Sequence, residues 1–160
     1  KPDAIAMAKG LGGGFPIGAI WLKEKWADIF QPGSHGTTFG GSPLACSAAH
    51  AVLDVIEQED LINKSHEKGE FLKLELKNFQ KEYPKLIKEI RGRGLMLALV
   101  MTKLPNELIA KFRQNGLLVV GAAENTIRFL PPLTISDNEL KEALRITKLS
   151  LEEFQPKPRR

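Results

Sequence analysis

The uneven distribution of glycine and of long amphipathic segments is the feature that most constrains what this chain can fold into. Up to about Gln58 the segments are short and rich in glycine and small residues, a pattern typical of strands and tight loops. After that point longer helical patterns alternate with short strands. We therefore expect two domains, over residues 1–58 and 59–154, followed by a tail over residues 155–160.

The first domain is expected to contain two strands, a glycine loop and one helix. Residues 3–8 form a short apolar run typical of a buried strand, and residues 19–22 form a second. Because so short a strand needs neighbours to pair with, we interpret the chain as the C-terminal part of a longer polypeptide. Ser42 and Pro43 are typical of a helix N-cap and first helical position. The apolar face of that helix is expected to comprise Leu44, Ala48, Val52 and Val55.

The second domain is expected to be a small α+β domain. Ser136 and Glu139 have the spacing of a capping box at the start of its last helix. The elements expected before that helix are a helix from Leu61 to a stop at Pro84, a buried strand over 95–101, a helix from Pro105 to about Gly116, and strands over 117–122 and 126–132. The pattern as a whole predicts an α/β fold, in which the end of a glycine-rich α/β domain precedes this small α+β domain.

Composition excludes several classes of protein. With 42% hydrophobic and 26% charged residues, the chain can bury a core and is not typical of a disordered or fibrous protein. We expect no membrane partner, because no segment is long and apolar enough to span a bilayer. The single cysteine, Cys46, rules out an internal disulfide and fits a reducing, cytoplasmic environment. The net charge is only +4 and lysines alternate with glutamates over residues 67–89, so we expect no nucleic-acid partner.

Lys9 stands between a small apolar run and a cluster of glycines at positions 10 and 12–14. Burial beside Ala6–Ala8 would disfavour the ammonium form and lower the pKa of Lys9, which makes the amine a nucleophile for a carbonyl or for pyridoxal phosphate. The glycines would let the backbone approach a flat cofactor closely. The alternative is a lysine that extends into water beside a mobile loop. Neither GxxxxGK[ST] nor GxGxxG spacing is present, so no phosphate-binding loop of those kinds is expected.

The stretch HGTTFGGSPLA, over residues 35–45, contains two adjacent hydroxyls with flanking glycines just before a helix N-terminus. Thr37 and Thr38 could therefore bind an anion, and in an extended segment they would face two different ligands. The alternative is a turn with an ordinary N-cap. We expect no metal site, because neither His50 nor His66 has ligand-like spacing to His35.

Arg128 lies inside the apolar stretch TIRFLPPL. A guanidinium matches a carboxylate bidentately, so Arg128 is a candidate for binding an acidic substrate. If Phe129 faces the core, Arg128 faces the opposite side of the sheet. The alternative is an arginine on an edge strand that faces water.

A family resemblance rests on four stretches and their order. They read AMAKGLGGGFPIGA, GSHGTTFGGSPLACSAAHAVLDVIE, IRGRGLMLALVM and RQNGLLVVGAAENTIRFLPPLTIS. Together they resemble the C-terminal half of the class III, or subgroup II, pyridoxal-phosphate aminotransferases, which have fold type I. The resemblance runs from residue 1 to about residue 154. Within this family the motifs are most similar to those of the acetylornithine aminotransferases.

The resemblance implies roles for four residues. Lys9 corresponds to the lysine that binds pyridoxal phosphate covalently, and Thr38 to the threonine whose hydroxyl binds the cofactor phosphate across a homodimer interface. Thr37 corresponds to a position that contacts substrate in acetylornithine enzymes, and Arg128 to the arginine near the substrate carboxylates. Ser42 replaces the usual asparagine, but since serine caps helices about as well, we expect little consequence.

The activity implied by the resemblance is transfer of an amino group from N-acetylornithine, or a related ω-amino donor, to 2-oxoglutarate, as in arginine biosynthesis. Ornithine, succinylornithine and 4-aminobutyrate aminotransferases are close alternatives. A non-transaminating Schiff-base enzyme and a non-catalytic dimerisation domain stay open too, because fold alone does not decide the reaction. In the family, the acid at the ring nitrogen, the stacking aromatic and the phosphate loop lie upstream, so we expect this chain alone to be inactive.

Overall fold

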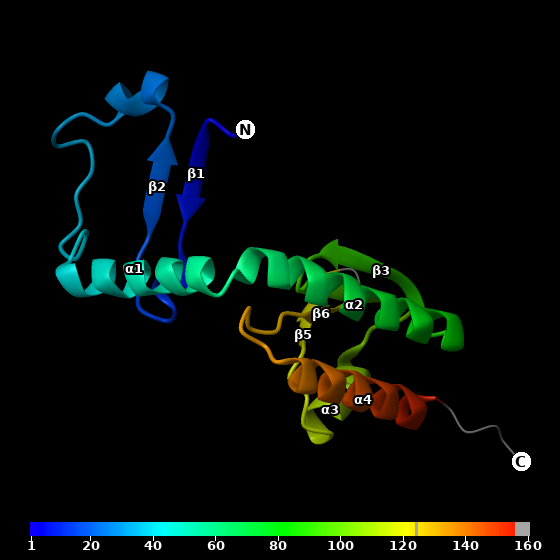
Figure 1. Ribbon diagram of the computed structural model, residues 1–160. Coiled ribbons are helices and arrows are strands. Elements are labelled where there is room, and N and C mark those ends of the chain that lie inside the picture. The colour runs from blue at the N-terminus through cyan, green and yellow to red at the C-terminus, as the bar shows by residue number, and fades with distance from the viewer. Residues whose placement is uncertain (124, 156–160) are drawn as a thin grey trace, which may run out of the picture. The chain divides into compact units, whose positions relative to one another are not determined.

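The computed structural model describes residues 1–123 and 125–155, and these form two compact units (Figure 1). The chain divides after Asp60, whereas the sequence pattern placed the boundary after residue 58. Of the tail expected over residues 155–160, all but the first residue lies outside the described part.

The first unit consists of a two-stranded sheet, two short 3-10 segments and one long helix. Strands β1 (Ala4–Met7) and β2 (Ala19–Leu22) pair antiparallel, with Ala4 opposite Leu22 and Met7 opposite Ala19. The remaining elements are η1 (Lys9–Gly12), η2 (Glu24–Ile29) and α1 (Pro43–Gln58). Both predicted strands are therefore present, and η1 occupies the start of the predicted glycine loop.

The prediction that the first strand is buried is wrong for the described chain. All four residues of β1 are exposed, and the side chain of Ile5 is 41% exposed. Within the described residues β1 has hydrogen-bonded partners in β2 alone, and a two-stranded sheet is marginal without a layer packed on it. The apolar sequence of β1 is thus not matched by burial within this unit.

Helix α1 begins as predicted but buries a different face. The side chain of Ser42 accepts a hydrogen bond from the N–H of Ala45 at 3.4 Å, and Pro43 is the first helical residue. The buried residues are Ala45 and Ala49, whereas Leu44 is 67% exposed. The face that packs is one residue further on than predicted, because small alanine side chains let the helix approach η1 closely.

The second unit is a four-stranded antiparallel sheet with order β3-β4-β6-β5, packed against three helices (Figure 1). The strands are β3 (Ile87–Arg93), β4 (Met96–Met101), β5 (Val120–Ala122) and β6 (Thr126–Phe129). The helices are α2 (Leu61–Glu82), α3 (Asn106–Gln114) and α4 (Asp137–Phe154). One face of the sheet joins the helices in a single core, to which Leu72, Leu76, Leu97, Leu99, Leu108, Phe112, Ile127, Phe129, Leu140, Leu144 and Leu151 contribute.

Most predicted elements of this unit are confirmed, and one strand was missed. The helices lie where expected, and the capping box of Ser136 and Glu139 is present. Strand β3 was not predicted, because its sequence, IKEIRGR, is too charged to form an apolar run. Pairing with β4 holds this segment in the strand conformation instead. The strand predicted over 126–132 ends at Phe129, since the prolines that follow cannot donate to a ladder.

The hairpin between β3 and β4 packs its backbone directly on α2. A Cβ added at Gly69 of α2 would lie 2.4 Å from the carbonyl carbon of Gly94, which is too close for any side chain. Gly92 has a φ of 116°, and a Cβ there would lie 2.1 Å from the carbonyl oxygen of Met96. Gly94 therefore serves close packing of the hairpin on α2, and Gly92 serves the close approach of the two strands within the hairpin. Among the described residues, no helix has the length and apolar character needed to cross a membrane.

Candidate functional site

Lys9 lies directly after β1 in a strained backbone conformation. Ala8 is extended, and Lys9 then turns into the left-handed region with a φ of 54°, where a residue other than glycine is uncommon. Successive turns hold this bend, because the N–H groups of Leu11 and Gly13 donate to the carbonyls of Ala8 and Gly10 at 3.2 and 3.1 Å. The end of the strand and the glycine turn together fix where the lysine side chain leaves the backbone.

A shallow cavity of about 580 Å³ adjoins Lys9. Its lining comprises Lys9, Gly10, Gly13, Gly14, Phe15, Pro16 and Ile17. A Cβ added at Gly10 or Gly14 would meet no atom within 4 Å, so the glycines keep this surface open. The cavity can therefore admit a flat group beside the lysine amine. Residues 15–17 are lining residues that the sequence did not indicate, although their apolar stretch directly follows the glycines.

The expected desolvation of Lys9 is not met within this chain, because Lys9 is exposed. At the other end of β1, two other lysines engage a carboxylate. Asp3 Oδ1 lies 2.9 Å from Nζ of Lys23 and 3.1 Å from Nζ of Lys25, and these two ammonium groups hold the pKa of Asp3 below its usual range. Lys9 forms no ion pair with any residue of the described ranges, so its amine is available to a ligand.

Thr37 and Thr38 lie at a turn just before α1. The N–H of Gly40 donates to the carbonyl of Thr37 at 3.3 Å, and the N–H of Ser42 donates to the carbonyl of Phe39 at the same distance. Both threonines are exposed. The threonines therefore lie on a turn that leads into the N-cap Ser42, and among the described residues no hydrogen bond engages either hydroxyl. Thr37 and Thr38 lie in the same unit as Lys9, but in the described residues neither threonine contacts Lys9 through a hydrogen bond or ion pair.

His35 packs its ring against that of Phe30, with the centroids 5.0 Å apart and the planes tilted by 57°. Within residues 1–123 and 125–155 no three histidine, cysteine, aspartate or glutamate side chains come together as metal ligands would. His35 therefore has an aromatic neighbour rather than a ligand set.

Arg128 lies on β6, opposite Ala98 of β4 and Val120 of β5. Phe129 is buried in the core and Arg128 is exposed, so the predicted alternation is confirmed. The edge-strand alternative is wrong, because β6 lies between two strands and Arg128 instead occupies the sheet face away from the helices. Arg128 makes no ion pair with the residues that the structure describes, which leaves the guanidinium able to bind an external carboxylate.

Comparison with known proteins agrees with these observations. The family Aminotransferase class-III matches residues 1–151. The chain is 44% identical over 143 residues to the mitochondrial acetylornithine aminotransferase of Saccharomyces cerevisiae. The matched region covers 89% of this chain and 34% of the yeast protein. It is also 44% identical over 148 residues to the ornithine aminotransferase of Oceanobacillus iheyensis. That match covers 91% of this chain and 36% of the Oceanobacillus protein.

The fold has a close counterpart among solved structures. The acetylornithine aminotransferase of Elizabethkingia anophelis superposes with a TM-score of 0.90 at 34% identity, covering 96% of this chain and 40% of that one. The chain therefore spans only about a third of the length of the curated relatives it matches.

Proposed function

The chain belongs to the class-III aminotransferases, and from this we propose that the whole protein transfers an amino group from N-acetylornithine to 2-oxoglutarate with pyridoxal phosphate as cofactor. The mixed α/β structure is that of the C-terminal part of the aminotransferase fold, as expected. The observation that carries the proposal is the unpaired Lys9 amine on a glycine-lined cavity, in a chain 44% identical to an acetylornithine aminotransferase. The function we propose belongs to arginine biosynthesis.

The residues around Lys9 suit pyridoxal phosphate. The open surface at Gly10 and Gly14 leaves room for a flat ring. The turn before α1 offers hydroxyls and a helix N-terminus for the phosphate of a cofactor in the partner subunit. When bound, the cofactor supplies an electron sink for the bond that breaks at the substrate carbon. The acid, aromatic and phosphate loop that we expect upstream would complete its site.

Lys9 has two roles in this proposal. Its amine would hold the cofactor through the cofactor aldehyde, for which an amine without a carboxylate partner is suited. When it is not holding the cofactor, the Lys9 amine would serve as the general base that takes a proton from the substrate carbon and as the general acid that returns this proton to the cofactor carbon. Arg128 binds a substrate carboxylate, and Thr37 contacts the substrate.

Thr38 provides a test of the phosphate assignment. Thr38→Val keeps the shape of the side chain and removes its hydroxyl, so the hydrogen bond to the phosphate is lost. A hydrogen bond to a charged group contributes about 1.5–3 kcal/mol, so we expect cofactor dissociation from the whole protein to be favoured about 10- to 100-fold. Thr37→Val should instead act mainly on the KM of the donor. Equilibrium dialysis of both variants measures the difference.

The same test bears on oligomeric state. We propose an isologous homodimer in which Thr38 reaches the cofactor phosphate of the partner subunit. Retention of cofactor by Thr38→Val as in the wild type, or an active monomer in analytical ultracentrifugation, would contradict the assignment. For location we propose the cytoplasm, on the ground of the lone Cys46.

An ornithine donor is the second candidate, because the Oceanobacillus iheyensis relative matches at the same identity. Turnover of the whole protein with N-acetylornithine, ornithine and 4-aminobutyrate, each with 2-oxoglutarate, decides between them. We expect the highest kcat/KM for N-acetylornithine. A higher value for ornithine would select the alternative. No transfer with any donor would favour a non-transaminating enzyme or a non-catalytic dimerisation domain.

A further inference from the structure

The loop over residues 130–135 begins directly after the strand that contains Arg128, and both of its ends are anchored. Phe129 and Ile135 belong to the buried core of the second unit, whereas Leu130 is 58% exposed. The N–H of Ile135 donates to the carbonyl of Pro132 at 3.0 Å, which closes a turn. Because side chains alternate along a strand, Leu130 continues the face on which Arg128 lies. The loop is therefore a neighbour of the guanidinium.

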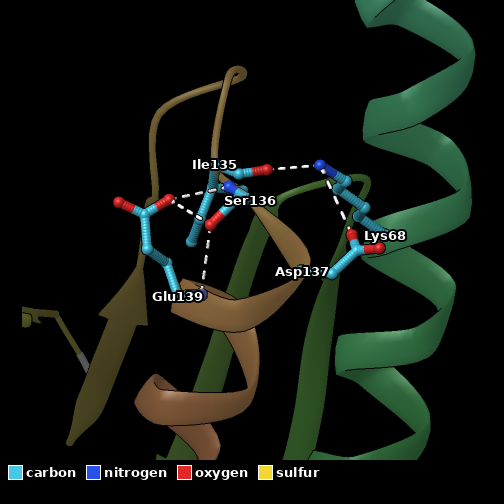
Figure 2. A network of polar contacts seen from close by, with 5 residues as sticks. All are labelled: Lys68, Ile135, Ser136, Asp137 and Glu139. Carbon is cyan, nitrogen blue, oxygen red and sulfur yellow. Dashed lines mark hydrogen bonds and ion pairs between the residues drawn. The ribbon is translucent and has the colours of Figure 1, made fainter.

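Lys68 of α2 holds the far end of this loop. Its Nζ donates a hydrogen bond to the carbonyl oxygen of Ile135 and lies 3.6 Å from Oδ1 of Asp137, as Figure 2 shows. The side chain of Lys68 is only 21% exposed. The side chain of Asp137 is 77% exposed, so water and salt screen the ion pair, and the hydrogen bond to the Ile135 carbonyl is the contact that holds the loop. Lys68 thus ties α2 to the point where the loop enters α4.

The start of α4 satisfies its other polar groups locally. The N–H of Glu139 donates to Ser136 Oγ at 3.2 Å, and the N–H of Ser136 donates to Glu139 Oε2 at 2.8 Å. These contacts with Ser136, and to a smaller degree the charge of Lys68, hold the pKa of Glu139 below its usual range. The capping box therefore fixes the helix end by itself, and the loop carbonyl of Ile135 is held from outside by Lys68.

Two other lysines near Lys68 allow the effect of its hydrogen bond to be distinguished from the effect of positive charge alone. Lys64 and Lys141 line the same surface depression as Lys68. Neither forms a hydrogen bond or ion pair with residues in the described part of the chain. Lys68 differs from them in what it binds, so Lys64 serves as a matched control on the same helix.

We propose that Lys68 is a positioning residue for Arg128, because it fixes the loop that follows Arg128 and so the direction in which the guanidinium meets a substrate carboxylate. This role rests on the proposed function, in which Arg128 binds that carboxylate. Phe129 and Ile135 stay buried and β6 stays paired, so release of the Ile135 carbonyl would loosen the loop between them, beside Arg128, rather than the strand itself. Two-point binding of a carboxylate by a guanidinium depends on such alignment.

Steady-state kinetics of the whole protein tests this role. Lys68→Met is expected to raise the KM for 2-oxoglutarate about tenfold with kcat little changed. The variant loses the charged hydrogen bond from Lys68 to the Ile135 carbonyl, which acts on the substrate through Arg128 and does not touch the substrate itself. Lys68→Arg should restore most of the wild-type KM, and Lys64→Met should leave it unchanged. In an Arg128→Ala background, Lys68→Met should add nothing further, because the two residues act on one contact.

Hydrogen exchange of residues 130–136 reports on the loop without reference to activity. We expect faster exchange there in Lys68→Met and wild-type exchange in Lys64→Met. Unchanged exchange, additive effects on KM in the double variant, or a fall in kcat alone would overturn the positioning role and leave the proposed function intact. Failure of the wild-type protein to transfer an amino group from any donor would overturn both.

Discussion

Replacing Lys9 with alanine in the whole protein is expected to lower kcat for amino transfer by about 10²–10⁴-fold, the range typical of a lost general acid–base group. The covalent attachment of cofactor is lost as well, since no amine remains at this position. Alanine is an L-residue like lysine, so the left-handed φ of 54° is no more strained in the variant and the fold should persist. Single-turnover measurement of amino transfer, with circular dichroism to monitor folding, checks both parts.

Lys25 provides the matched control. It is an exposed lysine of the same unit, and its Nζ lies 3.1 Å from Asp3 rather than beside the glycine cavity. Lys25→Ala should leave kcat close to the wild-type value. Equal losses in the two variants would mean that positive charge in this unit matters and that Lys9 has no particular role.

Replacing Phe112 with alanine is expected to cost about 3–5 kcal/mol in the free energy of unfolding of the second unit. The ring is fully buried and meets Phe129 edge-on, with the centroids 6.0 Å apart and the planes at 90°. Removing it leaves a cavity between α3 and the sheet and also removes the aromatic contact. Urea unfolding followed by the helical signal in circular dichroism gives the change in midpoint.

Phe71→Ala is the control, because Phe71 lies on α2 and is 41% exposed. Its substitution should change the free energy of unfolding much less than that of Phe112. Since β6 contains both Phe129 and Arg128, a destabilised core should also weaken carboxylate binding. Similar midpoints for the two variants would show that the packing of α3 contributes little to this unit.

The elements that the sequence predicted well share strong local signals. Helices α2 and α4 have apolar side chains at helical spacing, and the capping box of Ser136 marks where α4 begins. Strand β3 could not be predicted in this way, because its order comes from pairing with β4 and from backbone contact between Gly69 and Gly94. Contacts between residues so far apart in sequence leave no local pattern.

Burial in the first unit could not be predicted for a different reason. The apolar residues of β1 have a strand pattern, but in the described chain they are exposed. In α1 the choice of buried face depended on the small size of Ala45 and Ala49 rather than on the larger Leu44. Periodicity indicates which residues share a face, whereas the neighbour decides which face packs.

For the candidate site, the sequence supports a proposal of residues, and the geometry could be predicted only in part. Lys9, Thr37, Thr38 and Arg128 are proposed from their sequence setting and from the family resemblance, and their roles stay predictions. The alternation of Arg128 and Phe129 followed from strand geometry and is confirmed. The link from Lys68 to Ile135 spans 67 residues, and five helices and strands lie between them in the chain, so no motif in the sequence could indicate it.

The claim that Lys9 binds the cofactor is tested most directly by reduction with borohydride. The whole protein is incubated with pyridoxal phosphate, reduced, digested and examined by mass spectrometry for the lysine that has gained the cofactor. Our account predicts the adduct on Lys9, and none there after Lys9→Ala. An adduct on another lysine in the wild-type protein, with Lys9 unmodified, would contradict it.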